Sequence, residues 1–63
     1  MCLANVYLSQ NDALELVCSN ASSIISDSEG FVITDLLGRV FGVSGRITEV
    51  DLTGNKIIIL ADS

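Results

Sequence analysis

The sequence predicts a small all-β domain, a barrel or roll of five to seven short strands, and three observations lead to this fold class. Apolar residues alternate with polar ones at a period of two in several short segments, as in strands that bury one face. Five glycines and no proline separate these segments. The chain has 63 residues, which suffice for a single domain over residues 1–63 and leave no room for a second.

The first predicted strand covers residues 2–8, and a polar turn over residues 9–12 ends it. The second segment, residues 13–18, alternates in the same way but has another interpretation. Asp12 and Glu15 stand at the spacing of a helix capping box, so this segment could also be a helix. We favour a strand, because the serines and the asparagine that follow would continue a helix poorly.

The remaining segments are short and are separated by turns of recognisable composition. Residues 19–23 are predicted to form a turn or a single helical turn. The segment Asp27-Ser28-Glu29-Gly30 predicts a hairpin, because a glycine ends the turn. The strands between the turns cover residues 24–26, 31–35, 39–43, 45–52 and 56–60, with breaks at Leu37-Gly38 and Thr53-Gly54-Asn55.

The last predicted strand is apolar on both faces, because Ile57-Ile58-Ile59-Leu60 contains no polar residue. A strand of a small antiparallel sheet usually turns one face to water. Two explanations remain open at this point. The strand forms the buried seam of a dimer, or it lies centrally in the sheet and is covered by loops.

The charge balance argues against binding to nucleic acids and to anionic membranes. Eight acidic residues stand against Arg39, Arg46 and Lys56, the chain has no histidine, and the net charge is −5. Proteins that bind DNA or RNA neutralise phosphates with lysine and arginine, and basic segments likewise hold proteins to anionic lipids. Three scattered cations cannot form such a surface, so we predict neither kind of partner.

The hydrophobic content indicates a second chain instead. Hydrophobic residues make up 49% of the sequence, too much for a disordered chain. Because a core of this size rarely stabilises a domain alone, we expect a disulfide, a metal or a partner chain, and a homodimer is the simplest of these. The sequence predicts neither a signal peptide nor a membrane-spanning segment, so we expect a cytoplasmic protein, whose thiols stay reduced.

The sequence offers little for catalysis, and we predict that the protein is not an enzyme. It has no histidine to act as a general base near neutral pH, and no serine stands in the context of a catalytic nucleophile. Glu49 and Asp51 lie two residues apart and share a strand face, where they could chelate a cation. A solvated strand face is the commoner role of such a pair.

Cys2 is the candidate metal ligand, because its thiolate lies next to the α-amine of Met1. That amine, the amide nitrogen of Cys2 and its sulfur would form a planar donor set, which suits Ni(II) or Cu(II), whereas tetrahedral thiolate sites suit zinc. The second Cys2 of a dimer could supply the fourth ligand and place the metal on the two-fold axis. The other interpretation is that Cys2 is a small buried residue at the start of a strand.

Cys18 has a simpler explanation. Counting every second residue, it shares a face with Leu14 and Leu16, so it is predicted to be a core residue. A four-thiolate zinc site built by two copies of both cysteines lacks the short Cys-x-x-Cys spacing. A disulfide between Cys2 and Cys18 is disfavoured by the reducing compartment.

The chain starts with Met1-Cys2 and continues with the alternation of Ala4, Val6 and Leu8. Further along it contains the segments Leu36-Leu37-Gly38, Gly45-Arg46-Ile47, Val50-Asp51-Leu52 and Ile59-Leu60. In the order and spacing of these segments, the sequence resembles the CooT family of small nickel-binding accessory proteins of carbon monoxide dehydrogenase maturation, and the resemblance covers essentially the whole chain. The thiol of Cys18 and the serine-rich residues 19–26 depart from the family pattern.

The resemblance implies a homodimer of small Sm-like/SH3-like barrels that binds Ni(II) through Cys2 and delivers or stores nickel for carbon monoxide dehydrogenase. The alternative function is a non-catalytic protein interaction module without a metal, in which the barrel edge or the strand 57–60 docks a partner by strand addition. An RNA adaptor of the Sm type is a third hypothesis, which the net charge of −5 opposes.

Overall fold

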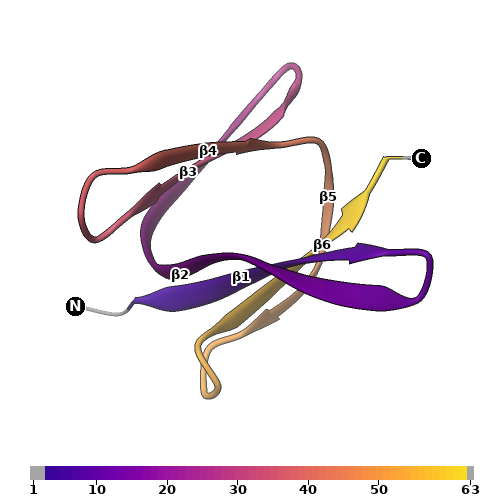
Figure 1. Ribbon diagram of the computed structural model, residues 1–63, viewed down its shortest axis with the longest axis horizontal. Helices are drawn as coiled ribbons and strands as arrows, with labels where there is room; N and C mark the ends of the chain where they lie inside the picture. The colour runs from indigo at the N-terminus through magenta and orange to yellow at the C-terminus, as the bar shows by residue number, and fades with distance from the viewer. Residues whose placement is uncertain (1–2, 63) are drawn as a thin grey trace.

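The computed structural model describes residues 3–62, which fold into one sheet of six strands (Figure 1). Neighbouring strands are antiparallel, except that β1 and β6 run parallel. The predicted all-β fold is therefore confirmed, and no helix within residues 3–62 is long and apolar enough to cross a membrane. The strands are β1 (Ala4–Gln10), β2 (Ala13–Asp27), β3 (Gly30–Asp35), β4 (Val40–Val43), β5 (Gly45–Asp51) and β6 (Lys56–Ala61).

The sheet curls around its core without closing. Its strand order is β4-β3-β2-β1-β6-β5, so β4 and β5 are the edges, and no hydrogen-bonded pairing joins these two strands in the described part of the chain. Figure 1 shows the ribbon enclosing an interior, with β3 and β4 on one side and β1 and β2 on the other. The molecule is thus an open roll measuring 32 × 25 × 15 Å, and the closed Sm-like/SH3-like barrel is not confirmed.

Strand β2 corrects the prediction for residues 19–23. These residues form no turn, because β2 continues through them for 15 residues and pairs first with β1 and then with β3. The strand bends at this point instead. Asn20 has a φ of 58°, and the pairing with β3 shifts register between Ala21 and Ser23. Asparagine tolerates this left-handed conformation, so the chain changes direction without leaving the sheet.

The predicted hairpin between β2 and β3 is confirmed. Asp27 pairs with Gly30, and the Asp27 carboxylate accepts a hydrogen bond of 2.8 Å from the Glu29 backbone N–H. Gly30 has a φ of 143°, and a Cβ atom there would collide with the backbone oxygen of Val43. Only glycine fits this corner, where β3 passes close to the end of β4.

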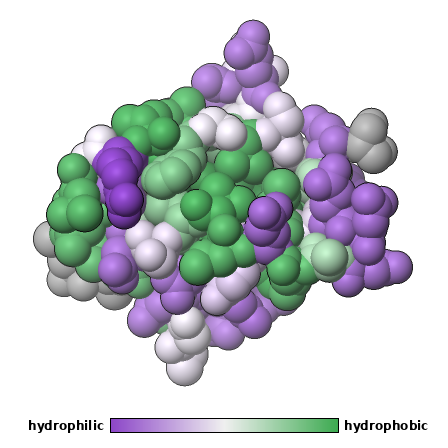
Figure 2. All heavy atoms as spheres, viewed as in Figure 1, coloured by the Kyte–Doolittle hydropathy of each residue, from purple (hydrophilic) through white to green (hydrophobic). Residues whose placement is uncertain are grey.

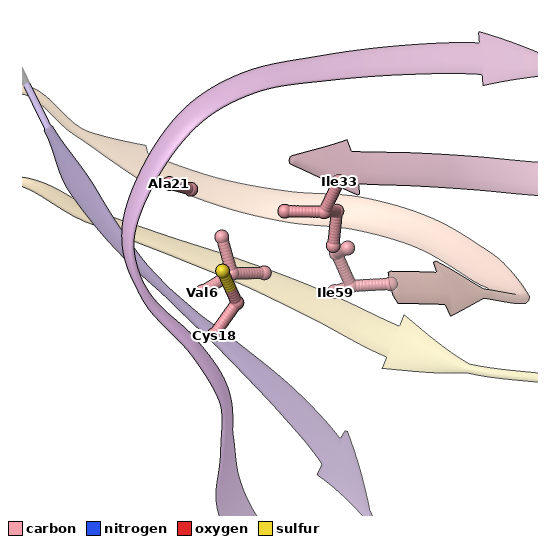
Figure 3. Packing of buried hydrophobic residues seen from close by; sticks show 5 residues of the cluster. All are labelled: Val6, Cys18, Ala21, Ile33 and Ile59. Carbon is pink, nitrogen blue, oxygen red and sulfur yellow. The ribbon is translucent and has the colours of Figure 1, made fainter. Parts of the chain in front are cut away.

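The core is small and lies on the inner side of the roll (Figure 3). Its members come from β1, β2, β3 and β6, and they are Val6, Cys18, Ala21, Ile33 and Ile59. Strand β6 lies between β1 and β5, so the prediction of a central strand holds. Because both of its edges are already paired, docking of a partner by strand addition at residues 57–60 is excluded.

Candidate metal centre

Cys2, the predicted metal ligand, lies outside the described residues 3–62. The structure does fix the point where the chain next enters the sheet. Strand β1 begins at Ala4, which pairs with Ala21 of β2. The backbone N–H of Asn5 donates a hydrogen bond of 2.8 Å to the backbone oxygen of Asn55. The start of β1 is therefore held between the bend of β2 and the β5–β6 turn.

An apolar pocket opens beside this start of β1. Its volume is about 250 Å³. Leu52, in the β5–β6 turn, is one of the lining residues, yet 84% of it is exposed, so it stands at the rim of the pocket and does not fill it. The pocket offers apolar surface and two serine hydroxyls but no charged ligand. Its lining residues are Ala4, Ala21, Ser22, Ser23, Ile24, Leu52 and Ile57.

Cys18 is a free and buried cysteine, 3% exposed, so its predicted place in the core is confirmed. Burial raises the pKa of its thiol, and the negative charge of Asp35 raises it further. The thiolate is the form that binds metals and attacks electrophiles, so both effects keep Cys18 inert.

The prediction that Leu14 and Leu16 share the face of Cys18 was wrong, and a bulge explains the error. Cys18 pairs with Val6, whereas Leu16 pairs with Tyr7, so two steps along β2 correspond to one step along β1. Val17 is the extra residue of this bulge. It moves Cys18 to the buried face and leaves Leu14 and Leu16 on the outer face, where they are 58% and 53% exposed.

Glu49 and Asp51 do share the outer face of β5, as predicted, but each is already engaged. They pair with Ile58 and Lys56 of β6, two residues apart. The carboxylate of Glu49 lies 3.6 Å from the Lys56 ammonium, and that of Asp51 accepts a hydrogen bond of 2.9 Å from the Gly54 N–H. Within residues 3–62, no three His, Cys, Asp or Glu side chains come together to hold a metal ion.

Asp35 is a buried carboxylate that the sequence did not single out. It is 3% exposed, and its carboxylate accepts hydrogen bonds from the N–H of Leu37 at 2.9 Å, the N–H of Arg39 at 2.8 Å and the Arg39 Nε at 2.6 Å. Burial by itself would raise the pKa of Asp35, but these hydrogen bonds and the Arg39 charge outweigh burial and lower it. All three donors belong to the β3–β4 turn, so Asp35 is a structural group.

Two comparisons with known proteins lead to the same family name. The model of a protein family described as "CO dehydrogenase accessory protein CooT" matches residues 1–60. A crystal structure from Carboxydothermus hydrogenoformans that carries the CooT name superposes with a TM-score of 0.90 at 19% sequence identity, over 98% of this chain and 100% of that one. At this identity the likeness shows the fold alone. No curated protein matches the sequence.

Proposed function

The chain belongs to the CooT family of CO dehydrogenase accessory proteins, and from this membership we propose that it binds Ni(II) through Cys2 at a homodimer interface. The nickel is the cargo, which the protein delivers or stores for maturation of carbon monoxide dehydrogenase. The observation that carries the proposal is the family match, because it spans residues 1–60 and so includes Cys2. The family is one of accessory proteins and not of catalysts.

The chemistry of the two cysteines supports Cys2 as the ligand. Cys18 belongs to the core, and its raised pKa disfavours the thiolate that a metal requires. Cys2 is the other thiol of the sequence, and it precedes the first residue of β1 by two positions. A thiolate with nitrogen donors is a suitable environment for Ni(II). A shell of few protein ligands also suits a protein that must release its metal.

A Ni(II) titration of the reduced protein tests this function. We expect thiolate-to-nickel absorption that saturates at about one nickel ion per two chains. Cys2→Ser should abolish the absorption, and Cys18→Ala is the matched control because it removes the buried thiol and should leave the absorption unchanged. Circular dichroism verifies that both variants fold. Nickel binding that survives in Cys2→Ser would refute the proposal.

The second candidate function is a protein interaction module that needs no metal. The two edge strands favour it, since β4 and β5 have no strand partner along their outer edges in the described structure. An extended segment of another protein could add to either edge. A dimer that shows no Cys2-dependent nickel absorption would favour this function over the first.

A further inference from the structure

The pocket beside β1 and the leucine at its rim form a self-complementary surface. The pocket is open, mainly apolar and about 250 Å³ in volume. Leu52 projects next to it with 84% of its surface in water, the largest exposed fraction among the large hydrophobic residues that the structure describes. A projecting apolar side chain and an apolar pocket on one face are what a two-fold symmetric contact needs, because each copy offers both to the other.

We propose that this face docks a second copy of the chain, with Leu52 of each copy seated in the pocket of the other. The inference rests on the homodimer of the proposed function and deepens it by naming the surface that pairs. Ala4 lines the same pocket.

The distribution of charge favours this face over the opposite end of the molecule. Two copies of a chain with a net charge of −5 repel each other least when their acidic parts lie apart. Five of the eight carboxylates lie in or close to the β1–β2 turn, the β2–β3 turn and the end of β6, namely Asp12, Glu15, Asp27, Glu29 and Asp62.

These acidic segments lie away from the pocket. Asp27, Glu29 and Asp62 line a common depression together with Gly45, which pairs with Ala61 at the far end of β6. The pocket lies at the near end of β6, beside Ile57. In the shared view of Figures 1 and 2, hydrophilic surface covers the side of the chain's C-terminal end, and hydrophobic surface extends from the centre toward the start of β1.

Three carboxylates lie nearer the pocket. Asp51 is next to Leu52 in sequence and accepts a hydrogen bond from the Gly54 N–H, with no salt bridge in the described part of the chain, whereas the other two are ion-paired. Asp35 is ion-paired with Arg39, and Glu49 with Lys56. The outer apolar residues Leu14 and Leu60 have three carboxylates within two residues, those of Asp12, Glu15 and Asp62, whereas Leu52 has one, that of Asp51. Docking through that outer surface would bring the carboxylates of both copies together, so the pocket face is the better site for a second copy.

The surface area of the molecule also fits a chain that pairs. The chain exposes 4305 Å². The scaling of folded monomers gives about 3,900 Å² for a mass of 6.7 kDa. The excess is about a tenth of the scaling value, and exposed apolar residues such as Leu52 contribute to it.

Sedimentation velocity of the metal-free, reduced protein tests the inference. Leu52→Asp should raise the dissociation constant of the dimer by roughly two orders of magnitude, because each of the two symmetric contacts would place a carboxylate in an apolar pocket. Leu52→Met retains an apolar side chain and should preserve the dimer. Leu14→Asp is the matched control, since it adds the same charge at another exposed leucine and should leave the dimer intact.

The outcomes separate this inference from the proposed function. A wild-type protein that stays monomeric overturns the inference, and so does a dimer that survives Leu52→Asp or is lost in Leu14→Asp. Nickel absorption with wild type and Cys2→Ser is measured independently. A Leu52-dependent dimer without Cys2-dependent nickel binding supports the inference while the nickel function fails.

Discussion

One buried carboxylate organises the β3–β4 turn. Asp35 receives two backbone N–H groups and the Arg39 guanidinium of the turn that follows it. These donors replace the water that an ionised carboxylate loses on burial, so the charge persists inside the fold. The sequence predicts a break at Leu37-Gly38 and places Asp35 at the end of the strand before it. It does not predict the burial, which depends on β2 pairing alongside.

Replacing Asp35 with asparagine should lower the free energy of unfolding at neutral pH, because an amide cannot accept the charged hydrogen bond of Arg39 as a carboxylate does. The folded pKa of Asp35 lies below its unfolded value, near 3.8. The carboxylate therefore adds stability above that pH, and this contribution is lost as the pH falls through the folded pKa.

Urea unfolding of wild type and Asp35→Asn across this pH range measures the effect. The difference between the two proteins should be largest at neutral pH and should shrink as the pH falls through the folded pKa of Asp35, where its carboxylate becomes neutral. Comparing the two proteins at each pH cancels the titration of the other seven carboxylates. A difference that grows on acidification would contradict the assignment.

The thiol of Cys18 should resist alkylation in the folded protein. It is 3% exposed and its pKa is raised, so both access and thiolate content are low. Treatment with iodoacetamide at neutral pH, followed by peptide mass spectrometry, should find Cys18 unmodified. The same treatment in denaturant is the control and should modify it fully. Rapid alkylation of Cys18 in the native state would mean that the core opens around β2.

At the scale of elements, the turns were predictable and the irregularities of β2 were not. The turn at Asp27-Ser28-Glu29-Gly30 depends on the residue types at these four positions, so the sequence alone predicts it. The bulge at Val17 and the bend at Asn20 arise from pairing with β1 and β3. Such pairing joins residues far apart in sequence, so alternation alone put Leu14 and Leu16 on the face of Cys18 and ended the strand too early.

A glycine corner between β4 and β5 should be sensitive to substitution. Gly45 has a φ of 146°, and a Cβ atom there would collide with the backbone oxygen of Leu60. Gly45→Ala should therefore reduce the free energy of unfolding by about 2 to 4 kcal/mol, from backbone strain together with crowding.

The matched control is Gly38→Ala. Gly38 has a φ of 86°, but no atom would lie within 4 Å of its Cβ, so only the strain remains. This variant should lose about 1 kcal/mol. Denaturant unfolding measures both. If both variants lose the same free energy of unfolding, the backbone around Gly45 moves away from β6 without a cost in stability, which would contradict the prediction.

At the scale of the whole molecule, the candidate site depends on long-range assembly. Alternation predicts Cys2 and Ala4 on one face, but no local pattern predicts that Ile24, Leu52 and Ile57 gather beside Ala4. The parallel pairing of β1 with β6 and the bend of β2 produce the pocket. The sequence thus predicted the metal ligand and a second chain, which both stay predictions, while the surface proposed for that chain emerged only from the fold.

Because the core is small, the predicted second chain should contribute to the stability of the fold. Only five hydrophobic residues of the described chain are buried. If unfolding and dissociation occur together, stability depends on protein concentration by mass action. Raising the concentration 100-fold should then stabilise the dimer by about 2.7 kcal/mol and raise its thermal midpoint by roughly 10 °C. Calorimetry in the presence of a chelator measures this without any contribution from nickel.

The Leu52 variant determines which surface causes this dependence. In Leu52→Asp the midpoint should be low and independent of concentration, because the folded chain no longer gains from association. Leu14→Asp carries the same added charge and should follow the wild-type curve. A midpoint that is constant for the wild type would mean that the open roll is stable alone, and the five-residue core would then suffice without a partner.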